Sequence, residues 1–194
     1  MAKKTVLLIL CICCTFTGNI FAQRTLPGMK GIEIRGGMVD GFHKSSRRTE
    51  LGYYTGAGLA FYTRNANKWV YGAEYLCRKY PYKNMGLPVA QFSLEGGYHY
   101  CFLSDASKTL FLYLGGSALL GYETVNWGEK VLDDGATIRN ADRFLYGGAV
   151  SLGLDIYITD AIVFQLSGRE RILWGSSVSR FHTLWGIGFM FIIN

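Results

Sequence analysis

The sequence contains little charge and little proline. Charged residues make up 18% of its 194 residues and there are only 3 Pro, against 25 Gly and 15% aromatic residues. This mixture is unusual for a cytosolic domain and is typical of a β-rich protein that presents apolar surface to something other than water. The sequence also lacks a phosphate-binding loop, a dinucleotide fingerprint and His or Cys at metal-ligand spacing, so we expect no cofactor and no metal.

Long apolar runs are missing as well, because no segment has the roughly 20 uninterrupted apolar residues that a membrane helix needs. The N-terminus instead carries basic Lys3 and Lys4, then a short apolar stretch, and then the small residue Ala22 as a cleavage point. This is the pattern of a secretory signal peptide. We therefore predict a signal peptide at 1–22 and a single mature domain at 23–194.

A lipoprotein signal ending at Cys11 is the alternative, but bulky Leu10 fits poorly before a lipidated cysteine.

Removal of the signal takes away two lysines, so the net charge falls from +6 to +4 (6 minus 2). No basic stripe interleaved with aromatics remains, and we expect no direct nucleic-acid binding. Only Cys77 and Cys101 are left, which is too few for a disulfide framework, and strand alternation points them to opposite faces.

Beyond the signal, apolar residues recur with a period of two rather than 3.6. In the segment 91–102, Phe92 and Leu94 fall on one face while Ser93 and Glu95 fall on the other. The same alternation runs through eight segments: 31–39, 51–63, 69–79, 91–102, 108–123, 143–158, 161–174 and 181–193.

Several of these segments are ten residues or longer, whereas strands of globular proteins usually have about five or six residues. A strand that crosses a bilayer at a tilt needs about 9 to 11. Lipid offers no partner to a free N–H or C=O group, so such a sheet must close on itself. We therefore predict an all-β fold, an eight-stranded antiparallel β-barrel in the outer membrane of a Gram-negative bacterium. A soluble β-sandwich is the alternative that strand length disfavours.

The connections between these segments alternate in length. The short ones are 63–68, 104–108 and 159–160, and the long ones are 40–50, 81–88, 124–142 and 175–180. Outer-membrane barrels have short periplasmic turns and longer outer loops. We expect the long connections to face the cell surface.

The connection at 124–142 and the strand before it carry four carboxylates, on Glu123, Glu129, Asp133 and Asp134. Carboxylate oxygens suit calcium, so a calcium site is one interpretation. The spacing does not match a calcium-binding loop, and a solvated outer loop is the interpretation we favour.

Nine charged residues fall on the small or polar faces of the strands: Glu33, Arg35, Glu74, Arg78, Glu95, Glu123, Asp155, Arg169 and Arg171. The interior of an eight-stranded barrel is just filled by side chains. We predict that these residues form a polar network that plugs the lumen. A gated path for protons or small solutes is the alternative.

Catalytic chemistry has few candidates. Ser176, Ser177 and His182 could form a Ser–His pair on the barrel rim that hydrolyses lipid, but no third partner or oxyanion hole is evident. His99 points inward and His43 lies in an outer connection. We expect no enzymatic activity.

A set of motifs gives the sequence a family resemblance. They are L-P-G-M-K-G-I-E-I at 26–34, W-V-Y-G-A-E-Y at 69–75, Q-F-S-L-E-G-G-Y at 91–98, G-Y-E-T-V-N at 121–126, V-L-D-D-G-A at 131–136 and R-I-L-W-G-S-S-V-S-R-F at 171–181. Together they resemble the TraO family of conjugative-transposon transfer proteins from Bacteroides and its relatives, over roughly 24–194. One departure is the ending F-I-I-N, because many outer-membrane barrels end in Phe.

The resemblance implies a part of the type IV secretion-like apparatus that passes single-stranded DNA from donor to recipient. Its expected partners are outer-membrane lipid and other transfer-operon proteins, and the family supplies no catalytic residues. We expect a non-enzymatic barrel that anchors or stabilises the mating channel, or contacts the recipient. The alternatives are a general surface barrel for adhesion or defence, and a lipid-modifying barrel enzyme.

Overall fold

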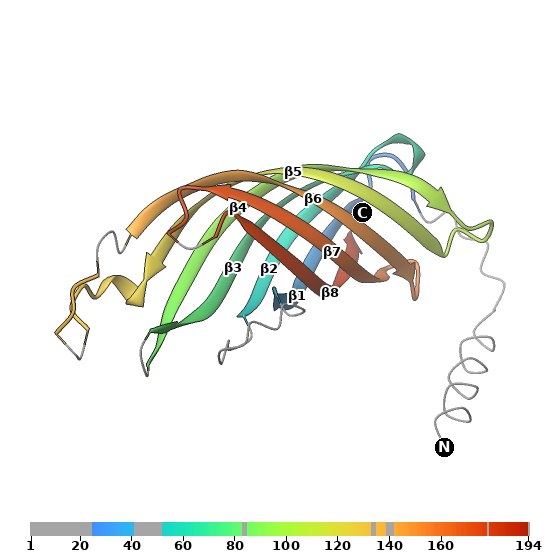
Figure 1. The fold of residues 1–194 in the computed structure, drawn as a ribbon. Coiled ribbons are helices and arrows are strands. Elements are labelled where there is room, and N and C mark those ends of the chain that lie inside the picture. Colours follow the sequence, from blue (N-terminus) through green and yellow to red (C-terminus); the bar gives the residue numbers. More distant parts are fainter. Residues whose placement is uncertain are drawn as a thin grey trace, which may run out of the picture.

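The strands close into one barrel in the computed structural model, which describes residues 25–40, 52–82, 85–132, 135–138, 142–177 and 179–193. They are β1 (Lys30–Val39), β2 (Gly52–Tyr62), β3 (Lys68–Tyr82), β4 (Met85–Ser104), β5 (Leu110–Val125), β6 (Asp142–Tyr157), β7 (Ile162–Trp174) and β8 (Phe181–Ile193). Each strand pairs antiparallel with its chain neighbours, and β1 pairs with β8 (Figure 1). The predicted eight-stranded antiparallel barrel is confirmed. The predicted signal peptide at 1–22 lies outside the described residues.

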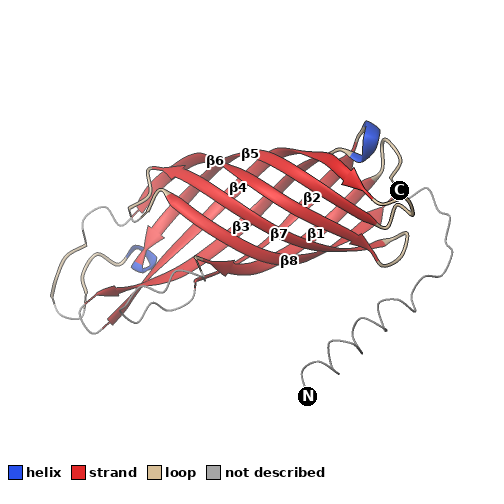
Figure 2. Cartoon of the chain, turned by 45° about the vertical axis from the view of Figure 1, so that its right-hand side comes forward, coloured by secondary structure: helices blue, strands red, loops and turns tan. Residues whose placement is uncertain are grey.

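The strands run obliquely to the barrel axis (Figure 2). A path of paired residues that leaves β1 at Lys30 crosses each of the strands β2 to β7 in turn and ends on Thr183 of β8. The Thr183 carbonyl accepts the Asp40 N–H, so the path returns ten residues further along the chain (40 minus 30). A closed sheet requires such a stagger, and eight strands leave an interior just wide enough for side chains.

The two ends of the barrel carry different connections. At the end where the C-terminus lies, short turns join β4 to β5 and β6 to β7, and the single-turn helix η1 (Arg64–Ala66) lies between β2 and β3 (Figure 2). The opposite end carries the long connections from β1 to β2 and from β5 to β6, the second of which begins with the single-turn helix η2 (Asn126–Gly128). We call these the turn end and the loop end. Most of the connection predicted at 40–50 lies outside the described residues.

The connection predicted at 81–88 is wrong, because β3 and β4 continue as a two-stranded ribbon. Their pairing extends to Tyr82 and Met85, although the registers of β3 with β2 and of β4 with β5 stop earlier, at Cys77 and Val89. A proline lacks the N–H that a central strand would use, and it is tolerated at a sheet edge. Pro88 therefore fits this ribbon, which the sequence alone suggested was a loop.

The connection predicted at 124–142 also contains regular structure. After η2, Val131 and Thr137 form an isolated antiparallel bridge, and the Ile138 N–H donates to the Lys130 carbonyl. Glu129, which directly follows η2, is exposed to solvent, while Asp133 and Asp134 lie outside the described residues. We call the connection 126–138, which includes η2, the loop-end hairpin. Its described residues present two exposed apolar side chains, Trp127 and Val131.

The outward-facing side chains are predominantly apolar on every strand. Ile34 on β1, Leu94 on β4, Leu114 on β5 and Ile187 on β8 are each more than half exposed. An apolar exterior on this scale would be unfavourable against water and is favourable against lipid chains. In the described part of the chain, no helix is long and apolar enough to cross a membrane.

Side chains fill the lumen in alternating apolar and polar layers. The turn-end layer contains Tyr62, Phe111, Tyr157 and Met190. Towards the loop end lie two smaller apolar groups, one with Val39, Tyr54, Leu76 and Leu184, and the other with Leu119, Leu145, Ala149 and Leu173. The polar residues lie between and beyond these layers.

Candidate functional site: the lumen and its two ends

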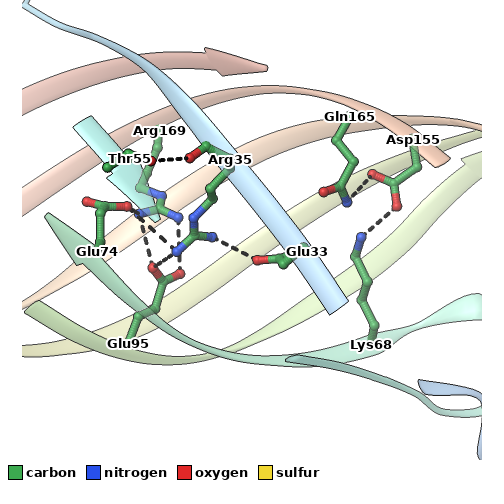
Figure 3. A network of polar contacts seen from close by, with 9 residues as sticks. All are labelled: Glu33, Arg35, Thr55, Lys68, Glu74, Glu95, Asp155, Gln165 and Arg169. Atoms are coloured by element: carbon green, nitrogen blue, oxygen red, sulfur yellow. Dashed lines mark hydrogen bonds and ion pairs between the residues drawn. The ribbon is translucent and has the colours of Figure 1, made fainter. Parts of the chain in front are cut away.

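The middle of the lumen holds six charged side chains, which we call the central ion cluster. It consists of three carboxylates and three guanidiniums: Glu33, Glu74, Glu95, Arg35, Arg169 and Arg171. Arg35 lies 2.6 Å from Glu95 and 3.1 Å from Glu33 (Figure 3). The formal charges cancel, which is what allows so many ionised groups to lie in a filled interior.

Glu74 contacts all three guanidiniums of the central ion cluster. Its carboxylate oxygens lie 2.8 Å from Arg171, 2.9 Å from Arg169 and 3.6 Å from Arg35. The relative exposure of Arg171 is 0% and that of Glu74 is 3%. Side chains from β1, β3, β4 and β7 therefore meet across the lumen and close it.

A second ion pair lies nearer the turn end. Lys68 Nζ is 2.6 Å from Asp155, and Gln165 donates to the other carboxylate oxygen of Asp155 at 3.1 Å (Figure 3). The same ammonium lies 4.4 Å from the centre of the Tyr113 ring, a cation–π contact. Lys68 was not among the predicted lumen residues, because residue 68 was assigned to a turn. Extending the strand alternation back from Glu74 would have placed Lys68 in the lumen.

Besides Asp155, two of the predicted network residues lie apart from the central ion cluster, Arg78 and Glu123 at the loop end. Arg78 pairs with Asp40, and the Asp40 carboxylate also contacts His182 Nδ1 at 3.2 Å. Partial burial alone would raise the pKa of Asp40, but the hydrogen bonds with His182 and with the Thr183 N–H, and the nearby Arg78 charge, lower it. Asp40 therefore stays ionised and ties β1 to β3 and β8.

Glu123 is the other separate residue. It is 1% exposed and accepts hydrogen bonds from Gln91 at 2.8 Å, from the Ser176 hydroxyl at 2.9 Å and from the Ser177 N–H at 2.8 Å. The β7–β8 connection is thus fastened to a carboxylate of β5. This carboxylate, the first of the four that suggested a calcium site, is occupied by hydrogen-bond donors.

The proposed Ser–His pair has a different arrangement. The hydroxyls of Ser176 and Ser177 donate to Glu123, whereas His182 Nδ1 contacts Asp40. A nucleophilic serine donates its proton to a histidine base that a third group orients. Here the two serines and the histidine contact different carboxylates.

A cavity of about 50 Å³ lies between the central ion cluster and the Lys68–Asp155 pair. Three buried polar atoms at this level lack a hydrogen-bond partner among the described residues: Arg35 Nε, His99 Nε2 and the Tyr113 hydroxyl. A space of this size holds a few water molecules, which could satisfy such groups.

Metal-ligand and thiol chemistry have little support in the described residues. These residues contain no group of three or more His, Cys, Asp or Glu placed to hold a metal ion. Cys77 and Cys101 are free thiols, as their opposite strand faces suggested.

These features define a class of protein, the small outer-membrane β-barrel with a filled lumen. Solved structures of this fold include Neisserial surface protein A, which is 14% identical with a TM-score of 0.53, covering 86% of this chain and 97% of that one. Another is Ail, the attachment invasion locus protein of Yersinia pestis, in complex with the heparin analogue sucrose octasulfate. It is 14% identical with a TM-score of 0.53, covering 87% of this chain and all of that one. Such low identity shows the fold alone.

The family comparison is more specific. Residues 26–193 match the model of the family described as conjugative transposon protein TraO. The protein therefore belongs to the TraO family, as its motifs suggested. No curated protein matches the sequence.

Proposed function

We propose that this protein is a closed outer-membrane anchor of a conjugative transfer apparatus and has no enzymatic role. Family membership supports the link to conjugation. The observation that carries the anchor role is the filled lumen, in which Arg171, Phe111, Tyr113 and Leu119 are all at most 1% exposed. An eight-stranded barrel filled in this way has no room for a DNA strand.

In this proposal the signal peptide at 1–22 exports the mature domain at 23–194. The apolar exterior then holds the barrel in outer-membrane lipid, and the turn end faces the periplasm. The partners are other proteins of the transfer operon, and the barrel does not itself bind nucleic acid. Barrel and partners together would fix the transfer channel at the outer membrane.

Recipient contact is a second candidate role, favoured by the loop-end hairpin. Trp127 is 61% exposed, and Val131 is 65% exposed on the same connection. Exposed aromatic residues on an ordered loop are common contact residues at interfaces. Replacement of 126–138 by a short Gly/Ser linker should lower transfer without lowering the amount of folded barrel if this role holds.

An adhesion or defence role unrelated to mating is the alternative. Its support is the fold likeness to Ail, which is described as an attachment invasion locus protein. This alternative predicts normal transfer without the protein but altered surface binding. A lipid-modifying role has less support, because Ser176 and Ser177 donate to Glu123.

The test is the transfer frequency from a donor that carries an in-frame deletion of this gene, with the intact gene supplied in trans as the control. The proposal predicts that the deletion abolishes transfer and that the intact gene restores it. Undiminished transfer from the deletion strain would reject the proposal and favour adhesion or defence.

A further inference from the structure

The turn end contains a groove with a volume of about 350 Å³ that opens to solvent. Its walls are the connection between β2 and β3 on one side and the β4–β5 hairpin on the other. The lining includes Asn65, Cys101, Leu103, Ser104, Lys108 and Phe111. Phe111 also belongs to the turn-end apolar layer, so the floor of the groove is the seal of the lumen.

The groove lies at an irregularity in β4. The register between β4 and β5 shifts between Cys101 and Leu103. Asn67 accepts the Cys101 N–H at 2.8 Å, which links the β2–β3 connection to the shifted strand. Such bulges are over-represented at barrel rims, where they re-aim side chains.

Three lining residues adopt a left-handed backbone conformation that non-glycine residues rarely occupy. The φ angles are +60° at Asn65, +60° at Ala66 and +55° at Lys108. Backbone strain of this kind concentrates at functional sites and persists only where surrounding contacts enforce it. The left-handed residues therefore mark the groove as a candidate functional site.

The charge of the groove is positive. The Lys108 ammonium contacts only a neutral group among the described contacts, the Ser104 hydroxyl at 2.9 Å. The ionised Asp105 carboxylate does not line the groove and accepts the N–H groups of Thr109 and Leu110 and the hydroxyl of Ser107, so Lys108 is the one charged side chain among the described lining residues. The groove thus offers an ammonium, hydroxyl and amide groups, and an apolar floor.

We propose that this groove binds an acidic, extended segment of a periplasmic protein of the same transfer apparatus. A carboxylate of that segment would pair with Lys108, and an adjacent apolar side chain would rest on Phe111 and Leu103. The inference rests on the proposed function, because it places the turn end in the periplasm and names the apparatus as the source of the partner.

The experiment places a photo-crosslinking phenylalanine derivative at Leu103 in the full-length protein of mating donors. The matched control position is Ile158, which has the same 58% exposure at the same end and does not line the groove. We expect a crosslinked product from Leu103 only, containing a protein of the transfer operon joined through an acidic segment. Lys108→Glu should lower its yield about tenfold or more, and Lys108→Arg should retain it, because close charge pairs dominate such contacts.

Three outcomes would overturn the inference: equal product from Ile158, a product that contains only a second copy of this chain, or a yield that Lys108→Glu leaves unchanged. Absence of any product would also overturn it. The amount of folded barrel, measured by its heat-dependent shift on a gel, controls for misfolding. If the gene deletion abolishes transfer while Lys108→Glu neither reduces transfer nor changes crosslinking, the groove inference fails and the proposed function stands.

Discussion

The central ion cluster makes the stability of the barrel depend on Glu74. Glu74→Gln keeps the size of the side chain but removes the charge that contacts Arg35, Arg169 and Arg171. Arg171 then has no carboxylate within ion-pair distance among the described residues, while remaining fully buried. Loss of one partner from a buried ion pair costs about 3–5 kcal/mol, because the other charge stays desolvated.

The measurement is urea-induced unfolding of the folded barrel in lipid vesicles, followed by tryptophan fluorescence. Glu129→Gln is the matched control, because it neutralises an exposed glutamate of the loop-end connection and should change stability by less than about 0.5 kcal/mol. Glu33→Gln should fall between the two, because Glu33 contacts Arg35 alone within the cluster.

A double variant separates the loss of charge from the loss of packing. Glu74→Met with Arg171→Met removes both charges of one pair, and replacement of a buried pair by apolar residues is often nearly neutral. We expect the double variant to be more stable than Glu74→Gln. Unfolding of Glu74→Gln and Glu129→Gln at the same urea concentration would contradict a stabilising role of the central ion cluster.

Three further predictions concern strand contact, the exterior and pH. Gly37→Ala should prevent folding, because the added Cβ would lie 2.0 Å from the Trp185 carbonyl oxygen. Gly116→Ala is the control, because its added Cβ would have no atom within 4 Å, and this variant should show the normal heat-dependent shift on a gel. Leu114→Arg on the lipid face should cost up to about 2–4 kcal/mol in vesicle unfolding, and Val131→Arg on the loop-end hairpin should cost little; equal costs would argue against a lipid-facing Leu114. The lowered pKa of Asp40 gives stability at pH above its ordinary value of 3.8, and that stability is lost as pH falls through the lower folded value. The free energy of unfolding of the wild-type protein should therefore fall below about pH 3.8 by more than that of Asp40→Asn. Parallel pH profiles of the two proteins would contradict this.

Strand alternation made the barrel predictable from sequence. A period of two assigns each residue to a face, so Glu74 and Arg169 could both be placed in the lumen without knowledge of the register. Their contact could not be predicted, since it joins residues 95 positions apart and depends on the stagger of the closed sheet. The same limit explains why Arg78 and Glu123 were grouped with the central ion cluster but lie at the loop end.

The remaining differences arise where tertiary contacts override local signals. Residues 81–88 were predicted as a connection, yet β3 and β4 pair through them, and both prolines lie beyond the pairings of these strands with β2 and β5. Beside the shift of register after Cys101, the Cys101 N–H donates to Asn67, which lies 34 positions away. Lys68 was missed because the strand begins one residue earlier than the apolar pattern indicated.

The central claim is that the barrel serves transfer as a closed anchor and not as the DNA conduit. Conductance of the purified, folded protein in planar lipid bilayers tests this claim most directly. We expect no stable wide-pore steps above those of the empty bilayer, because the central ion cluster and the apolar layers fill the lumen. A stable conductance of wide-pore size that single-stranded DNA blocks as it passes through would contradict it.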